Sequence, residues 1–174
     1  MKELSKILES RMKIRFHDCD PFNHLNNSRY IDYILTARGD QLLDYYNLDI
    51  YQVARTRGLG WVSAQTQICY LQPALLMEEV CIQTCLIGYS PRSLLLEAFM
   101  WDGNKTRLKT VMWARLVHYN LQTATSHTHA EEFRQLFEQV SLPLLPAIPF
   151  EERIKSLREE IARGGLPVPG GRGR

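Results

Sequence analysis

The chain has 174 residues, of which 45% are hydrophobic and 23% charged, and its formal net charge is +2 at pH 7. This length suits one domain around a single buried core, and the composition is ordinary for a globular protein. The small net charge, without a basic face in residues 1–140, argues against a nucleic-acid partner. No apolar run has the length of a membrane span or the form of a signal peptide, so we expect neither.

The cysteines indicate a reduced, cytoplasmic protein. Their spacing fits neither a disulfide framework nor a zinc site. Cys81 and Cys85 lie four residues apart in a strand-like run, so we expect them to share one face as buried thiols. His127 and His129 have no third ligand nearby, and we expect a polar lead-in to a helix there rather than a metal site.

The first expected elements are a short strand over 12–17 and a long helix over 28–46. Asn26 or Asn27 can cap this helix, which contains Gly39 but no proline. The apolar positions of the helix form a stripe that is too wide for a surface helix. We therefore expect the helix to be surrounded by protein.

The sequence period changes after the helix. Runs rich in Val, Ile, Thr, Trp and Tyr predict strands over 60–71, 79–89, 93–101 and 105–119. Short turns between them imply antiparallel pairing. The order of one strand, a helix and four strands predicts an α+β fold, in which a curved antiparallel five-stranded sheet wraps around a long central helix.

The composition changes beyond a short helix expected over 130–140. Residues 141–174 hold five of the eight prolines and five of the ten glycines. We therefore divide the chain into a domain over 1–140 and a C-terminal extension over 141–174. Within the extension, an apolar stripe predicts a helix over 150–163; it consists of Phe150, Ile154, Leu157 and Ile161. We expect residues 166–174 to form a disordered, dispensable tail.

The segment between the first strand and the long helix carries the candidate chemistry. Asp18-Cys19-Asp20-Pro21 is followed by His24-Leu25-Asn26-Asn27. An acid held beside exposed N–H groups at a helix start is a workable arrangement for reactions at a carbonyl group. Asp20 is the candidate catalytic acid; the alternative is an Asp-Pro turn residue that only caps the loop.

On these motifs the chain resembles the hotdog-fold thioesterases, in particular the branch containing 4-hydroxybenzoyl-CoA thioesterase and related acyl-CoA and acyl-ACP thioesterases. The resemblance covers residues 10–140 and includes Tyr30, Tyr33 and Ala37-Arg38. It implies a dimer whose sheets join edge to edge, with active sites between the subunits. Open sheet edges favour such pairing independently, so we expect a homodimer or a homotetramer built from dimers.

The resemblance also implies roles for individual residues. Asp20 would be the nucleophile or general base, and a backbone N–H near Asn27 would bind the oxyanion. His24 and Asn26 could position water or substrate, although a helix entry held by side-chain hydrogen bonds explains them slightly better. No cofactor is implied beyond the pantetheine of the substrate, which is an acyl-CoA or acyl-ACP.

Other polar residues have weaker assignments. Arg92 is a candidate contact for a CoA phosphate, and a plain surface arginine explains it as well. Tyr30 is a substrate-binding candidate for which core packing is the stronger explanation. We expect Asp18 to pair with Arg15 or to form a loop hydrogen bond, and Arg38 to form a helix salt bridge.

The leading functional hypothesis is a thioesterase that converts an acyl-CoA or acyl-ACP to a free acid and a thiol. The alternative is a non-catalytic acyl-thioester binding protein on the same fold. A hotdog dehydratase is a third possibility, but the paired Asp and His of such enzymes are not evident here. The sequence has no Gly-x-Ser-x-Gly elbow and no phosphate-binding loop, which argues against a serine hydrolase or a nucleotidase.

Overall fold

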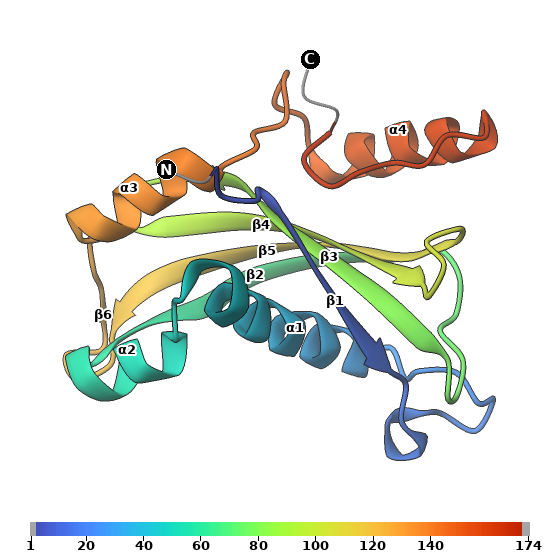
Figure 1. Ribbon diagram of the computed structural model, residues 1–174, viewed down its shortest axis with the longest axis horizontal. Coiled ribbons are helices and arrows are strands. Elements are labelled where there is room, and N and C mark those ends of the chain that lie inside the picture. Colours follow the sequence, from blue (N-terminus) through green and yellow to red (C-terminus); the bar gives the residue numbers. More distant parts are fainter. Residues whose placement is uncertain (1–2, 172–174) are drawn as a thin grey trace.

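A computed structural model describes residues 3–171 of the chain and shows an α+β hotdog fold. A curved antiparallel sheet holds helix α1 against its concave face, and helix α4 lies on the other side (Figure 1). The strands are β1 (Ile7–Lys13), β2 (Leu59–Tyr70), β3 (Glu79–Tyr89), β4 (Ser93–Asp102), β5 (Leu108–Asn120) and β6 (Thr125–Ser126). The α-helices are α1 (Arg29–Tyr46), α2 (Ile50–Arg57), α3 (Glu131–Val140) and α4 (Phe150–Ala162).

The sheet order is β1-β3-β4-β5-β2, so β1 and β2 are the edge strands. All pairs are antiparallel, as the short turns predict. The two residues of β6 pair with the end of β5 and make the sheet six-stranded rather than five-stranded. This topology leaves the outer edge of β2 without a partner strand among residues 3–171.

Two elements near the N-terminus differ from the sequence prediction. The first strand covers Ile7–Lys13 instead of 12–17, and Phe16–Asp18 forms a 3-10 turn. The strand lies at a sheet edge and places the polar Ser10 on the side that faces α1, which breaks the alternation that identifies a strand. Helix α2 was also not predicted; it is only eight residues long and is capped by Asp49, whose side chain accepts the N–H groups of Tyr51 and Gln52.

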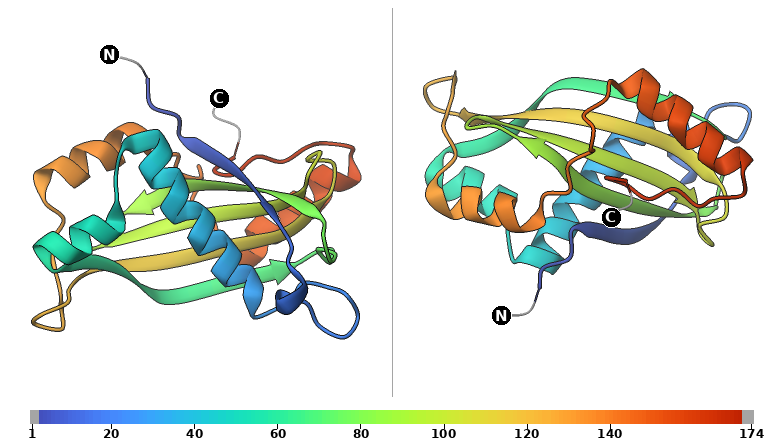
Figure 2. Two further views of the ribbon diagram at one scale, coloured as in Figure 1. Left: turned by 60° about the horizontal axis from the view of Figure 1, so that its bottom comes forward. Right: turned by 90° about the horizontal axis from the view of Figure 1, so that it is seen from above.

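Helix α1 packs into the concave face of the sheet, as its wide apolar stripe predicts (Figure 2, left). Successive turns of α1 bury Tyr30, Tyr33, Ile34 and Ala37. They meet residues of β3, β4 and β5 whose side chains point toward the helix; these are Val80, Ile82, Ala98, Met100, Met112 and Ala114. The helix and the sheet therefore share one core.

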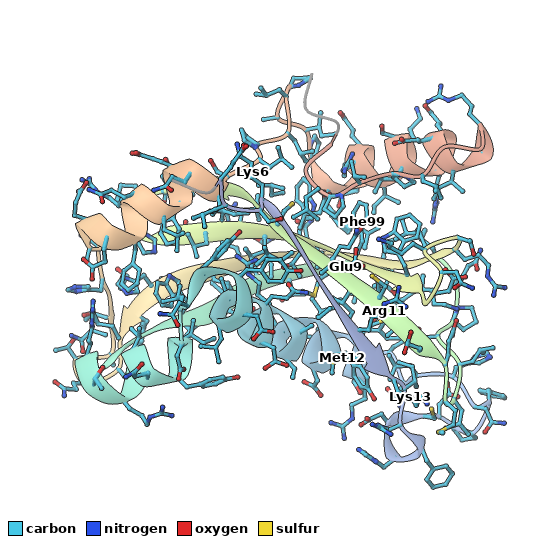
Figure 3. The ribbon with its side chains drawn as sticks, in the orientation of Figure 1. Lys6, Glu9, Arg11, Met12, Lys13 and Phe99 are labelled. Carbon is cyan, nitrogen blue, oxygen red and sulfur yellow. The ribbon has the colours of Figure 1, made fainter. Side chains whose placement is uncertain are left out.

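Helix α4 covers the convex face of the same sheet (Figure 2, right). Phe150, Ile154 and Leu157 are buried there, whereas the fourth residue of the predicted stripe, Ile161, remains 39% exposed. Phe99, labelled in Figure 3, lies on the covered face of β4, and the guanidinium of Arg153 lies 5.8 Å from the centre of its ring. Cys81 and Cys85 are buried together on this face, as expected.

A buried ion pair fixes the extension to the sheet. Arg153 of α4 forms a two-pronged contact with Glu97 of β4, from Nε to Oε1 at 2.9 Å and from Nη2 to Oε2 at 3.0 Å. The indole N–H of Trp113 donates to Glu97 Oε1 at 2.9 Å. Both charged side chains are almost fully buried. Hydrogen bonds to ionised groups in such surroundings are about twice as strong as neutral ones.

The expectation of a disordered tail is wrong for residues 166–171. Arg153 Nη2 donates to the carbonyl of Val168 at 2.9 Å, and the N–H of Gly170 donates to Glu97 Oε2 at 2.6 Å. Pro167, Pro169 and Gly170 are buried. Apolar content alone does not predict this order, because the tail is held by backbone groups that satisfy a buried ion pair. Residues 172–174 of the expected tail lie outside the described residues.

We predict that Arg153→Met destabilises the protein by about 3–5 kcal/mol, because it leaves the Glu97 carboxylate buried and unpaired. The double variant Glu97→Gln with Arg153→Met is expected to recover most of this loss, since it contains no unpaired charge. Urea unfolding of the wild type, both single variants and the double variant measures the coupling. Strictly additive effects of the two substitutions are the result that contradicts a coupled ion pair.

Candidate active site

The acidic loop that follows β1 folds around the carboxylate of Asp20. Oδ1 accepts the N–H groups of Phe22 at 2.9 Å and His24 at 3.1 Å. The backbone N–H of Asp20 donates to the carbonyl of His24 at 2.8 Å. Oδ2 accepts no hydrogen bond from residues 3–171. One oxygen of this carboxylate therefore fixes the loop, and the other is free to contact a ligand.

The entry to α1 has a different arrangement at each asparagine. Asn26 Oδ1 accepts the N–H and the hydroxyl of Ser28 at 3.0 and 2.9 Å, which makes Asn26 a structural cap. The carbonyl of Asn27 accepts the phenol of Tyr70 at 2.8 Å. The N–H of Asn27 has no acceptor within the part of the chain that the structure describes. It is a spare donor beside the start of a helix, where the helix dipole favours negative charge.

A pocket of about 190 Å³ brings four of the predicted site residues together. Asp20, His24, Asn27 and Tyr30 form one wall, and residues 70–73 at the end of β2 form the other. The sequence motifs did not predict this second wall, because residues 70–73 look like the ordinary end of a strand. Asn26 does not line the pocket.

Tyr30 has a structural role in this wall. Its ring is buried, and its hydroxyl accepts the N–H of Ala74 at 2.9 Å. Burial raises the pKa of Tyr30, so the phenol stays neutral at physiological pH. The ring of Tyr70 meets it edge-on, with 5.1 Å between the ring centres. These contacts hold both pocket walls in place, and the core role expected for Tyr30 agrees with them.

The side chain of Asp18 contacts helix α1 rather than the side chain of Arg15. Its Oδ2 accepts the hydroxyl of Tyr33 at 2.8 Å, and its Oδ1 lies 3.6 Å from Arg29 Nε. Arg15 contributes only backbone groups: its N–H donates to the Tyr33 hydroxyl at 3.0 Å, and its carbonyl accepts the backbone N–H of Asp18 at 3.1 Å. The expected pairing of Asp18 with the Arg15 side chain is therefore wrong. Tyr33 connects the loop to α1 through both contacts.

Arg92 is far from the Asp20 pocket within one chain. Lys13, at the end of β1 from which the acidic loop leaves, pairs with Glu79 at the start of β3. Arg92 follows the opposite end of β3, and its carbonyl accepts the N–H of His118. Figure 1 shows the acidic loop and the β3–β4 turn at opposite ends of the sheet.

A larger groove of about 450 Å³ adjoins the Asp20 pocket. The two share Tyr70, Leu71 and Gln72 as a common wall. The far side of the groove is formed by α4, the segment after it and the β4–β5 turn; its charged residues are Arg107 and Arg158. Sequence reasoning missed this groove, because only the docking of α4 places Arg158 next to the end of β2.

The histidines near α3 form an aromatic cluster. His129 Nε2 accepts the indole N–H of Trp61 at 3.1 Å, and its Nδ1 lies 3.1 Å from the carbonyl oxygen of Ser90. The ring of His118 stacks on those of both Trp61 and His129, and burial lowers its pKa to about 4. Within residues 3–171, no three His, Cys, Asp or Glu side chains are grouped to hold a metal ion.

Comparison with known proteins places this site in a family. A profile described as the thioesterase-like superfamily matches residues 14–163. The chain belongs to this thioesterase-like superfamily and shares its hotdog fold. Its enzyme class is that of thioester hydrolases.

One sequence relative and two solved structures illustrate what this superfamily member is similar to. The long-chain acyl-CoA thioesterase FadM of Escherichia coli K12 is 24% identical over 133 residues, which cover 76% of this chain and 98% of FadM. The probable thioesterase YbaW of Escherichia coli gives a TM-score of 0.65 at 24% identity, covering 76% of this chain and 98% of YbaW. A Staphylococcus aureus protein whose structure was solved in complex with CoA gives a TM-score of 0.72 at 13% identity. The match covers 88% of this chain and 95% of the Staphylococcus aureus chain.

None of the described helices is both long and apolar enough to cross a membrane.

Proposed function

We propose that this thioesterase hydrolyses an acyl-CoA or acyl-ACP thioester to the free acid and the thiol, with Asp20 as nucleophile or general base. The observation that carries the proposal is the Asp20 pocket, in which a carboxylate with one anchored and one free oxygen meets the spare N–H of Asn27. The activity named for FadM, on long-chain acyl-CoA, supports an acyl-CoA substrate.

The proposed reaction follows from the two groups in the pocket. The Asn27 N–H binds the thioester carbonyl oxygen and stabilises the negative charge that develops on it. Asp20 Oδ2 then acts in one of two ways. Either it attacks the carbonyl carbon to give an acyl anhydride, which water later cleaves, or it accepts a proton from a water that attacks. In both cases the carbon–sulfur bond breaks, the thiolate leaves and takes up a proton, and no cofactor takes part.

His24 lines the same pocket, and its ring forms no hydrogen bond with other residues in the range 3–171. We assign it to orientation of the attacking water. The competing hypothesis is a protein that binds acyl thioesters without cleaving them, in which Asp20 only shapes the loop. The two hydrogen bonds at Oδ1 fit both proposals, whereas the free Oδ2 and the spare N–H favour catalysis.

The proposed enzyme is a dimer in which the β2 edges pair, with a dimer of dimers as the alternative. The outer edge of β2 has no partner strand in residues 3–171, and Phe22 beside Asp20 is 77% exposed. Pairing of two copies would cover both features. All four cysteines are free thiols, which supports a cytoplasmic location.

The carrier end of the substrate has two candidate sites in this dimer. In an antiparallel pair of β2 strands, the Tyr70 end of one strand lies beside the Leu59 end of the other. Arg92 lies toward that Leu59 end, so it would reach the Asp20 pocket only from the partner subunit. Arg107 and Arg158 line the adjoining groove of the same chain, and both are positioned for phosphate groups of CoA or of the ACP prosthetic group.

We predict that Asp20→Asn lowers the turnover of a good acyl-CoA substrate by at least about 10²-fold, because the variant lacks the catalytic carboxylate. Asparagine keeps an oxygen that accepts the N–H groups of Phe22 and His24, so the loop and the melting temperature are expected to change little. Thiol release is followed across a panel of acyl-CoA thioesters.

The matched control is Asp20→Ala, which removes both the carboxylate and the loop acceptor. It is expected to lose activity as Asp20→Asn does and, in addition, about 1–3 kcal/mol of stability. An Asp20→Asn enzyme with near wild-type turnover overturns the assignment. Tight acyl-CoA binding without hydrolysis by the wild type favours the non-catalytic alternative.

We predict that Arg158→Ala raises the KM for acyl-CoA about tenfold or more and leaves kcat unchanged, since it removes a charge-assisted contact made equally in the ground and transition states. The same acyl group on N-acetylcysteamine, which has no phosphate, should show no change. Arg92→Ala tests the partner-subunit site in the same assay. Lys155→Ala is the control, because Lys155 is exposed on the same helix and does not line the groove. Equal effects of Arg158→Ala and Lys155→Ala contradict the groove assignment.

A further inference from the structure

Helix α1 contains a buried arginine without a charged partner. Arg38 is 7% exposed, and its only hydrogen bond within residues 3–171 runs from Nη1 to Thr84 Oγ1 at 3.0 Å. No carboxylate of the described chain lies within ion-pair distance of it. The helix salt bridge expected for Arg38 from the sequence is therefore wrong.

The neighbours of Arg38 are already satisfied. The Thr84 hydroxyl donates its single proton to Gln41 Oε1 at 2.5 Å and accepts the hydrogen bond from Arg38. Gln41 Nε2 donates to Ser10 Oγ and to the carbonyl of Ile82, both at 3.0 Å. A guanidinium has five N–H donors, so most donors of Arg38 remain unused.

These unused donors are accessible to solvent rather than enclosed in the core. The buried side-chain nitrogen and oxygen atoms without a partner in residues 3–171 belong only to Thr110 and His118. The free nitrogens of Arg38 therefore reach accessible space, and Arg38 lines a cavity of about 490 Å³. This volume lies in the range of small-molecule sites.

The cavity is otherwise mostly apolar. It lies between the C-terminal half of α1, the start of α2, helix α3 and the concave face of the sheet. Its apolar lining comes mainly from large side chains, among them Leu42, Leu48, Leu86, Leu94, Leu96 and Phe137. Asp32 also lines it, but this carboxylate is exposed and pairs with Arg29 at 3.1 Å.

A buried, unpaired guanidinium is costly, and burial lowers the pKa of Arg38 although arginine stays charged in proteins. The cost falls when an anion enters the cavity and accepts the unused donors. A carboxylate matches the planar fork of a guanidinium with two parallel hydrogen bonds. An aliphatic chain attached to it would fill the apolar remainder of the cavity.

We propose that this cavity binds an aliphatic carboxylate, with its head group on Arg38 and its chain against the leucines and Phe137. The site is separate from the Asp20 pocket, and no residue lines both. The ligand has two possible sources. It is either a free fatty acid, the product class of the proposed reaction, or the terminal carboxylate of an acyl chain that carries one at the end remote from the thioester.

The test compares dodecanoic acid with dodecanol on the full-length wild type, by calorimetric titration and by the shift in melting temperature. The acid is expected to bind at least about tenfold more tightly than the alcohol, since only the acid offers two charged acceptors to Arg38. In Arg38→Met this preference is expected to disappear through weaker binding of the acid, with little change for the alcohol. Arg38→Lys keeps the charge without the fork and is expected to retain part of the preference.

Equal binding of acid and alcohol by the wild type overturns the proposal without requiring any variant. If the wild type binds the acid and the alcohol equally and both Arg38 variants fail to fold or to dimerise, Arg38 instead forms a structural contact between copies.

Dodecanedioyl-CoA and dodecanoyl-CoA identify the source of the carboxylate. A lower KM for the first, lost in Arg38→Met, indicates the terminal carboxylate of a substrate, and equal KM values indicate a free acid. Binding of the acid is measured without hydrolysis, so the binding result can be interpreted even if the protein does not hydrolyse thioesters.

Discussion

Two tyrosine hydroxyls fix the geometry on which the candidate active site depends. Tyr33 receives the N–H of Arg15 and donates to Asp18, so it ties the acidic loop to the second turn of α1. Tyr30 receives the N–H of Ala74, so it ties the segment after β2 to the first turn. Because both rings are buried in the core, the two walls of the Asp20 pocket are set by the packing of α1 against the sheet. A site held in this way can keep a carboxylate and an N–H donor at a fixed separation, which preorganised electrostatic catalysis requires.

The C-terminal extension connects the convex face of the sheet with this site. Arg153 and Glu97 anchor α4, and the backbone of Val168 and Gly170 completes the same ion pair. The anchored helix then places Arg158 next to the end of β2, beside the residues that also line the Asp20 pocket. The extension thus covers apolar sheet surface and, on our proposal, supplies a contact for the carrier end of the substrate.

Much of the fold follows from patterns that act over short distances. The wide stripe of α1, the strand-like runs and the short turns between them depend on local geometry, and the sequence predicts them well. The bounds of the edge strand β1 and the existence of the short helix α2 escape prediction because neither element has a strong period. The site is predictable in part for the same reason. The loop motif identifies Asp20 and Asn27, but Tyr70 and Arg158 come from elements distant in sequence. The unpaired state of Arg38 and the order of residues 166–171 depend on tertiary contacts that no local pattern contains.

The most direct test of the proposed active site is a crystal structure with a 2-oxoalkyl-CoA, in which a methylene separates the carbonyl from sulfur and leaves no thioester to cleave. We expect the carbonyl oxygen at about 3 Å from the Asn27 N–H, with the carbonyl carbon facing Asp20 Oδ2. A ligand whose carbonyl lies outside the Asp20 pocket, with Asp20 bound only to its own loop, is the result that contradicts it.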